Sequence, residues 1–241
     1  MCFVFFVVET GFLGMKRLEG IRAVTFDVGS TLIEAWPSVG AVYAQVAAQH
    51  GCPALSAAEL ERRFREAFEA TGRRANSRAD WERIVDAAFA GLVATPPSRT
   101  FFPALYEWFA QAQAWRIFDD VLPTLAALRA RGLRLGVISN WDDRLRGLLQ
   151  ALDLARHFDV LVVSCEVGVL KPERPIFEAA LSALDLPAAT VVHVGDDFES
   201  DVVGARAAGL HGLHLVRHGT AGDHAITSLG ELLDRIELAR D

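Results

Sequence analysis

The chain has 241 residues, of which 51% are hydrophobic, so it can bury a full core and still carry a second, smaller domain. Its formal net charge of −7 argues against nucleic acid or an anionic membrane as a partner, and no stretch approaches the roughly 18 uncharged apolar residues of a membrane-spanning helix. The three cysteines, Cys2, Cys52 and Cys165, are odd in number and lack metal-site spacing, so we expect a reduced, cytoplasmic protein without disulfides.

Residues 1–20 differ from the remainder of the chain, and we take them as an N-terminal extension. The run from Phe3 to Val8 is apolar but short, follows no basic residue and precedes no small-residue cleavage site, so it does not predict a signal peptide. Met15, which two basic residues follow, suits the start of the compact domain. We therefore expect residues 1–14 to be either a poorly ordered extension or a strand added at a sheet edge.

A strand is predicted from Ile21 to Phe26, because branched and aromatic residues dominate this stretch. The strand ends at Asp27, and Gly29 two places later lets the backbone turn sharply around the carboxylate. A carboxylate at the tip of a strand can be a nucleophile or a metal ligand, but it is more often a turn residue or a helix cap. This stretch alone does not decide between these roles.

From Val39 to Ala112 the hydrophobic pattern is helical throughout, and it predicts four helices without a strand. The second helix opens with a capping box, Ser56-Ala-Ala-Glu59. Because these helices follow the first strand directly, we expect an inserted helical cap domain over 35–115. The apolar residues at helical spacing are Val39, Tyr43 and Val46; Leu60, Phe64 and Phe68; Ile84, Val85, Ala88 and Leu92; and Leu105, Trp108 and Ala112.

After Arg116 helices and strands alternate, which is typical of a parallel sheet with helices on both faces. We expect strands over 133–138, 160–163, 191–194 and 212–216, and helices over 121–130, 144–152, 173–184, 198–208 and 229–238. The predicted fold is therefore α/β, with a Rossmann-like core over 21–34 and 116–241 and an inserted helical-bundle cap.

Polar residues follow each of the predicted core strands, at the edge where parallel sheets bind their ligands. Each of them also has an ordinary interpretation as a turn former, a surface charge or an acidic residue at the start of a helix. The set comprises Asp27 after the first strand, Ser139 and Asn140 after the second, Lys171 after the third, and Asp196, Asp197 and Asp201 after the fourth.

Lys171 is unusual, because the chain has 22 arginines and only two lysines. A lysine against this bias favours a site that needs a compact point charge, and we expect it to face a ligand rather than the core. Asp27, Asp196 and either Asp197 or Asp201 would crowd negative charges that only a cation makes tolerable. Oxygen-only ligation suits Mg²⁺, and Mg²⁺ beside a lysine and a hydroxyl suits a phosphate group.

Four segments together resemble the ordered motifs of the haloacid dehalogenase superfamily of hydrolases, and the resemblance spans residues 21–216. The chain is most similar to the group in which a helical cap follows the first motif. The segments are Asp27-Val-Gly-Ser-Thr31, Ser139 in VISN, Lys171 in LKPERPIF, and GDDFESD at 195–201.

The resemblance implies a Mg²⁺-dependent phosphatase that acts on a small phosphorylated metabolite through an aspartyl phosphate. Asp27 would be the nucleophile, and the cap would close over the site and select the leaving group. The implied metal ligands are Asp27, the Gly29 carbonyl and Asp196, with Asp197 or Asp201 completing the shell; the implied phosphate-binding residues are Ser139, Asn140 and Lys171.

Gly29 departs from the family pattern, because phosphatases of the family usually carry a second Asp there as general acid and base. Such proton transfer is worth about 10²–10⁴-fold, so we expect weakened hydrolysis of alkyl phosphates. Two alternatives stay open. One is a non-catalytic phosphate-binding or interaction protein on the same scaffold. The other is a metal-free 2-haloacid dehalogenase, which also lacks the second Asp but does not need the acidic residues at 195–201.

Neither the substrate nor the oligomeric state follows from the sequence. A phosphonate-cleaving relative would need a lysine in the cap, and the chain has none between residues 17 and 170. Aromatic residues could line a pocket under the cap or could fill a core. The candidates are Trp36, Tyr43, Trp108, Trp115 and Trp141.

Overall fold

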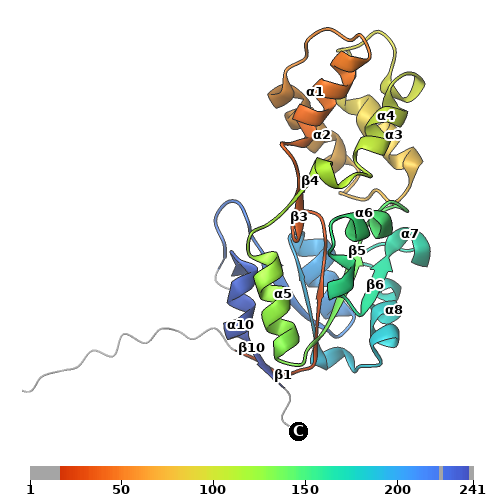
Figure 1. Cartoon of the computed structure of the whole chain (residues 1–241). Coiled ribbons are helices and arrows are strands. Elements are labelled where there is room, and N and C mark those ends of the chain that lie inside the picture. The colour runs from red at the N-terminus through yellow and green to blue at the C-terminus, as the bar shows by residue number, and fades with distance from the viewer. Residues whose placement is uncertain (1–16, 223–224, 239–241) are drawn as a thin grey trace, which may run out of the picture.

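The computed structural model describes residues 17–222 and 225–238. The chain forms a core built on a sheet and a helical unit that stands on one side of it, joined by the strands β3 and β4 (Figure 1). Most of the extension expected over 1–20, including the run from Phe3 to Val8, lies outside the described residues. In the described part of the chain, no helix has the length and apolar character to cross a bilayer.

The central sheet has six strands in the order β6-β5-β2-β7-β8-β9, and every neighbouring pair is parallel. β2 lies in the middle, where Ala23 pairs with Arg134 on one side and with Val191 on the other. The carboxyl ends of all strands therefore share one edge. The strands are β2 (Ala23–Phe26), β5 (Arg134–Ser139), β6 (Val160–Val163), β7 (Val191–Gly195), β8 (His211–Leu215) and β9 (Ala225–Ile226).

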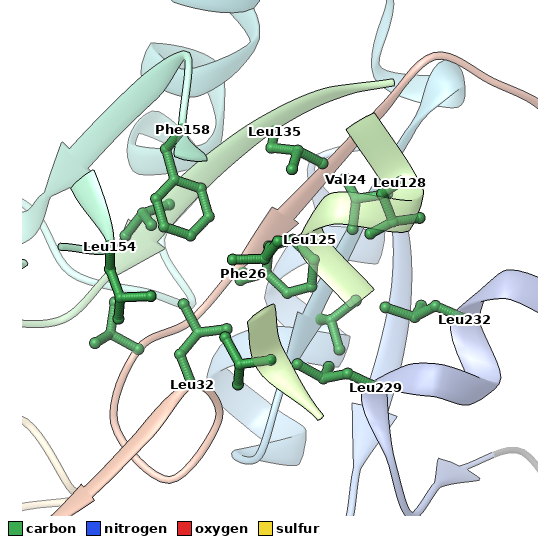
Figure 2. Packing of buried hydrophobic residues seen from close by; sticks show 14 of the residues in the cluster. Val24, Phe26, Leu32, Leu125, Leu128, Leu135, Leu154, Phe158, Leu229 and Leu232 are labelled. Carbon is green, nitrogen blue, oxygen red and sulfur yellow. The ribbon is translucent and has the colours of Figure 1, made fainter. Parts of the chain in front are cut away.

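Helices cover both faces of this sheet, so the predicted fold class is confirmed. Successive residues of β2 point to opposite faces: Val24 and Phe26 pack with Leu125 and Leu128 (Figure 2), while Ala23 joins the cluster beneath the opposite face. The core helices are α5 (Val121–Ala130), α6 (Leu145–Ala151), α7 (Ser164–Val167), α8 (Arg174–Leu184), α9 (Gly204–Ala207) and α10 (Leu232–Arg235).

The helical unit, which we call the cap, has an aromatic core of its own. Tyr43 lies at its centre, with ring centroids 5.9 Å from Phe64 and 5.6 Å from Phe89. The predicted helix start at Ser56 is present, since its side chain accepts from the Glu59 amide, whereas the reciprocal capping box occurs at the next helix, at Ser77. The helices are α1 (Val39–Gln49), α2 (Ala57–Ala70), α3 (Arg78–Ala88) and α4 (Phe102–Trp108).

Two short sheets were not predicted. β3 (Ile33–Ala35) and β4 (Trp115–Ile117) pair antiparallel where the chain enters and leaves the cap. β1 (Leu18–Ile21) pairs with β10 (Ile236–Leu238).

Three predicted elements need correction. The helix expected over 229–238 is helical only to Arg235, because the next three residues pair with β1. The strand expected from Ile21 to Phe26 is divided at Arg22 between two sheets. The helix expected over 198–208 consists of a π-helical segment, η5 (Phe198–Val203), followed by α9.

Candidate active site

Asp27 follows β2 at the centre of the sheet edge and is 9% exposed. Its amide donates to the Val194 carbonyl at 2.9 Å, which fixes the residue beside the end of β7. The chain then turns tightly, because the amides of Leu32 and Ile33 both donate to the Val28 carbonyl and Ser30 adopts a left-handed φ of 55°. The turn leaves the Asp27 side chain at the tip of the strand, as the sequence predicts.

Two side chains from other segments hold one oxygen of Asp27. Ser139 Oγ, at the end of β5, donates to Asp27 Oδ1 at 2.9 Å, and Lys171 Nζ donates to the same oxygen at 2.6 Å. Within residues 17–222 and 225–238, no hydrogen bond is made to Asp27 Oδ2. One oxygen is therefore fixed, and the other is left for chemistry.

Lys171 is itself buried, with 2% of its surface exposed. Its ammonium group donates to Asp27 Oδ1, to Asp201 Oδ1 at 2.6 Å and to the Ile138 carbonyl at 2.8 Å. These three acceptors match the three N–H donors of an ammonium group. In this arrangement the charge of Lys171 is neutralised by two aspartates, and its contact with a ligand stays a prediction.

Asn140 fixes the backbone of Lys171. Its side-chain amide donates to the Lys171 carbonyl at 3.0 Å, and its side-chain oxygen accepts from the Lys171 amide at 2.7 Å. This paired contact joins the end of β5 to the loop after α7. Asn140 thus sets the position of the ammonium group, a role that the sequence pattern did not predict.

Asp201 belongs to a buried chain of polar groups. Its Oδ1 also lies 3.2 Å from His193 Nε2, and His193 Nδ1 lies 3.0 Å from Thr25 Oγ1. Burial alone would raise the pKa of Asp201, but Lys171 and His193 outweigh it and lower the pKa below its ordinary value. Burial lowers the pKa of His193, so the imidazole stays neutral at pH 7.

The protonation states of Lys171 and Asp27 depend on the charges around them. Burial would lower the pKa of Lys171, yet Asp201 and Asp27 outweigh it and raise that pKa, which keeps the lysine charged. Burial raises the pKa of Asp27, and Lys171 opposes this rise. The buried lysine therefore favours the ionised form that a nucleophilic carboxylate needs.

Asp196 and Asp197 make a different contact, with an arginine of the cap. Arg73 lies in the loop after α2 and donates from Nη2 to Asp196 Oδ2 and from Nη1 to Asp197 Oδ2, both at 2.9 Å. Its backbone is left-handed, with a φ of 57°. The sequence analysis missed Arg73, because one arginine among 22 in a loop carries no pattern.

Three carboxylates gather where a cation could bind. Asp27, Asp196 and Asp201 each bring an oxygen within 4.8 Å of the others, whereas Asp197 is not part of this group. Burial, and next the charge of Asp27, raise the pKa of Asp196 to about 7. Hard oxygen donors with an excess of negative charge suit Mg²⁺, so the residues present fit that ion.

Trp141 covers the position at which the family pattern has a second Asp. A Cβ placed on Gly29 would lie 3.3 Å from Cζ3 of the Trp141 ring. The backbone of Gly29 is not left-handed, so a side chain there is opposed by the indole and not by the turn itself. The indole thus lies against Gly29, next to the nucleophile, and would have to shift by a few tenths of an ångström to admit a side chain there.

A cavity of about 940 Å³ lies between the cap and the sheet edge and includes Asp27 and Lys171 in its wall. We call it the active-site cavity. Of the aromatic residues considered from the sequence, Tyr43, Trp115 and Trp141 line it. Trp36 is instead 46% exposed, and Trp108 packs against the core of the cap.

Comparison with known proteins agrees with this geometry. The family model described as haloacid dehalogenase-like hydrolase matches residues 21–209. Human haloacid dehalogenase-like hydrolase domain-containing protein 3 is 34% identical over 241 residues, which cover 92% of this chain and 95% of that protein.

Two further relatives carry phosphatase names. The phosphoglycolate phosphatase of Yersinia pseudotuberculosis is 30% identical over 215 residues, 89% of each chain. The crystal structure of a HAD phosphatase from Thermococcus onnurineus superposes with a TM-score of 0.64 and 27% identity, covering 90% of this chain and all of that one.

Proposed function

Because the chain belongs to the haloacid dehalogenase-like hydrolase family, we propose that it is a Mg²⁺-dependent phosphatase of small phosphorylated molecules. The observation that carries the proposal is the hydrogen bonding of Asp27. Its Oδ1 accepts from Ser139 and Lys171, while its Oδ2 accepts no hydrogen bond from the described residues. We further propose that residues 35–115 act as a cap over a core of 21–34 and 116–241, and that the protein is cytoplasmic.

The reaction we propose has two displacements at phosphorus. Asp27 Oδ2 attacks, the bond from phosphorus to the leaving oxygen breaks, and the leaving group takes the bonding electrons. A water molecule then attacks the aspartyl phosphate, which releases phosphate and restores the carboxylate. Ser139 and Lys171 stabilise the negative charge that gathers next to Asp27, because they are already positioned and no solvent must reorganise.

We propose that Asp27, the Gly29 carbonyl and Asp196 hold the Mg²⁺, which when bound would neutralise charge on the phosphoryl oxygens. Asp201 serves the site differently in this proposal. Both of its oxygens already accept hydrogen bonds, from Lys171 on one side and from the Asp197 amide on the other. Asp201 is therefore a positioning residue for Lys171, and Asp197 lies outside the group of three.

The absence of a side chain at Gly29 limits the substrates that this site can turn over. Without an acid there, an alkoxide must leave unprotonated, and the loss is about 10²–10⁴-fold in rate. Acyl phosphates do not suffer in the same way, because a carboxylate leaves without a proton. We therefore propose that activated phosphates are hydrolysed well and alkyl phosphates poorly.

Asp27 and Asp196 argue against the two alternatives, a non-catalytic phosphate-binding protein and a metal-free dehalogenase. The absent acid supports a non-catalytic phosphate-binding protein, but such a protein has no need of an Asp27 with one oxygen kept free. A metal-free dehalogenase does not require Asp196 beside Asp27, an arrangement that burial and repulsion make costly. Both features favour the phosphatase.

The test is turnover of acetyl phosphate, ethyl phosphate and 2-chloropropionate with and without Mg²⁺. We expect Mg²⁺-dependent release of phosphate from acetyl phosphate, about two orders of magnitude less from ethyl phosphate, and no release of chloride. Asp27→Asn should remove the activity. Mg²⁺ should also raise the melting temperature, and Asp196→Asn should abolish that rise. If Mg²⁺ binds but acetyl phosphate stays intact, the non-catalytic alternative holds.

A further inference from the structure

The walls of the active-site cavity carry aromatic side chains that are only partly buried, and four of them also pack against the two hydrophobic cores. Phe68, on α2, is half-buried and lies outside the buried cluster of the cap. Its ring stacks on Phe64 with centroids 5.7 Å apart at 10°, and on Trp81 with centroids 5.7 Å apart at 15°. All three residues line the cavity. They form a stack of flat rings, which we call the cap stack.

A second pair of rings lines the cavity from the core side. Trp141, which covers Gly29, has its ring centroid 5.3 Å from that of Trp115 on β4. Both indoles are half-buried and both line the cavity. A group bound next to Asp27 therefore meets an indole at the place where other phosphatases of the family carry an acid.

These features together restrict the leaving group. The site beside Gly29 offers an aromatic surface instead of a proton donor, so it suits a group that is flat and apolar and that departs as an anion. A phenol meets both conditions, since it ionises near a pKa of 10, as the tyrosine side chain does. Rings also interact favourably with other rings in stacked or edge-on contacts.

The cations of the cavity are already paired. Lys171 and Arg73 both line it, but Lys171 is paired with Asp27 and Asp201, and Arg73 with Asp196 and Asp197, while the Arg73 guanidinium carbon lies 6.0 Å from the centre of the Phe68 ring. These charges alone do not select the substrate, and the aromatic walls are what distinguishes one phosphate ester from another. Resting on the proposed function, we infer that the substrates of this protein are aryl phosphates, with the aromatic ring held between the cap stack and Trp141.

The experiment compares phenyl phosphate with 2-naphthyl phosphate, whose phenols have nearly the same acidity, so that only the size of the ring differs. We expect kcat/KM to be about three- to tenfold higher for the naphthyl ester, from the added ring contacts. Phe68→Leu, which keeps an apolar side chain without a ring, should remove most of this preference, measured as the ratio of the two kcat/KM values within the same variant.

Phe89→Leu is the matched control, because Phe89 is buried in the cap and does not line the cavity. It should lower stability without changing the preference for the larger ring. Equal kcat/KM for the two esters, with acetyl phosphate hydrolysed, would overturn the inference and leave the phosphatase proposal intact.

A binding measurement tests the aryl phosphate site even if the phosphatase proposal fails. 2-Naphthylmethylphosphonate cannot be hydrolysed, and its affinity is measured by calorimetry against that of benzylphosphonate. Tighter binding of the naphthyl compound, lost in Phe68→Leu, supports an aryl phosphate site even if no ester is turned over. Equal binding of the two phosphonates in the natural protein would overturn it.

Discussion

The carboxylates of the site fall into two pairs whose charges are balanced in different ways. The inner pair, Asp27 and Asp201, shares Lys171, which is 2% exposed and belongs to the same core. The outer pair, Asp196 and Asp197, shares Arg73, whose side chain is 39% exposed and belongs to the cap. The inner cation is buried within the core, whereas the outer cation reaches the site from a separate unit of the molecule.

This difference indicates where a metal ion can enter. A divalent cation cannot displace Lys171 without leaving an ammonium group buried and unpaired, which costs several kcal/mol. Displacing Arg73 costs little, since the guanidinium is partly in water and can be solvated there. The outer pair is therefore the exchangeable half of the cluster, and changes at Lys171, Asp196 and Arg73 test that division.

The largest effect is expected from Lys171→Met. Removing the buried cation leaves Asp27 and Asp201 unpaired, and the free energy of unfolding should fall by about 3–5 kcal/mol. Urea denaturation measures this loss, and Lys171→Met combined with Asp201→Asn should recover part of it. A loss below about 1 kcal/mol would show that the inner pair depends on its cation no more than a surface pair does.

The free energy of unfolding should depend on pH through the titration of Asp196, a member of the outer pair. Asp196 ionises near its ordinary pKa of 3.8 in the unfolded chain but at about 7 in the fold, so between these values only the folded state keeps the proton. The contribution of Asp196 to stability therefore falls as the pH rises from about 4 to 7 and is lost above that.

Asp196→Asn removes this titration. The metal-free variant should match the natural protein near pH 4 and exceed it near pH 8 by about 2–4 kcal/mol, measured by urea denaturation at both pH values. Asp185→Asn, on an exposed turn, serves as a control that should follow the natural protein. Parallel pH profiles for natural protein and Asp196→Asn would contradict the assignment.

Arg73→Gln should strengthen the binding of Mg²⁺. The natural arginine competes for Asp196 and repels the ion, so its removal should tighten Mg²⁺ binding by up to about fivefold, as for an ion pair worth less than about 1 kcal/mol. Calorimetry at low salt measures the change. Arg74→Gln, at the neighbouring exposed position, should have no effect, and weaker Mg²⁺ binding in Arg73→Gln would mean that the arginine supports the ion.

Adding a further carboxylate, as Gly29→Asp, should restore only a small part of the missing acid catalysis. The new side chain must displace the Trp141 ring, which a Cβ would approach to 3.3 Å, so turnover of ethyl phosphate should rise less than tenfold. Gly29→Asp with Trp141→Ala should raise it further, because the carboxylate can then reach the leaving oxygen. Equal rates in the single and double variants would show that Trp141 does not block the acid.

The sequence predicts the parts of this site that depend on chain order. Runs of branched residues that each end in a polar residue place Asp27, Ser139 and Asp196 at one edge, and the structure brings them there. The strands of three residues, β3, β4 and β10, are too short for any periodicity to appear.

Contacts between distant segments are not predicted in the same way. Nothing in the sequence indicates that the Lys171 ammonium group donates to Asp27, Asp201 and the Ile138 carbonyl, because burial depends on the whole fold. The contact made by Arg73 is even less predictable from the sequence. Its contact with Asp196 spans 123 residues and joins two units of the molecule, so no local pattern can contain it.

The paired linkers β3 and β4 give the cap a restricted mechanical freedom. They pair antiparallel over three residue positions, and Arg116 contacts both Glu34 and the Trp36 ring across them. Twisting the cap about this connection would break the ladder, whereas bending it would not. The cap is also tied to the core by Tyr106, whose hydroxyl donates to Asp143 Oδ1, and any movement of the cap about these linkers would carry Arg73 and Phe68 away from the site together.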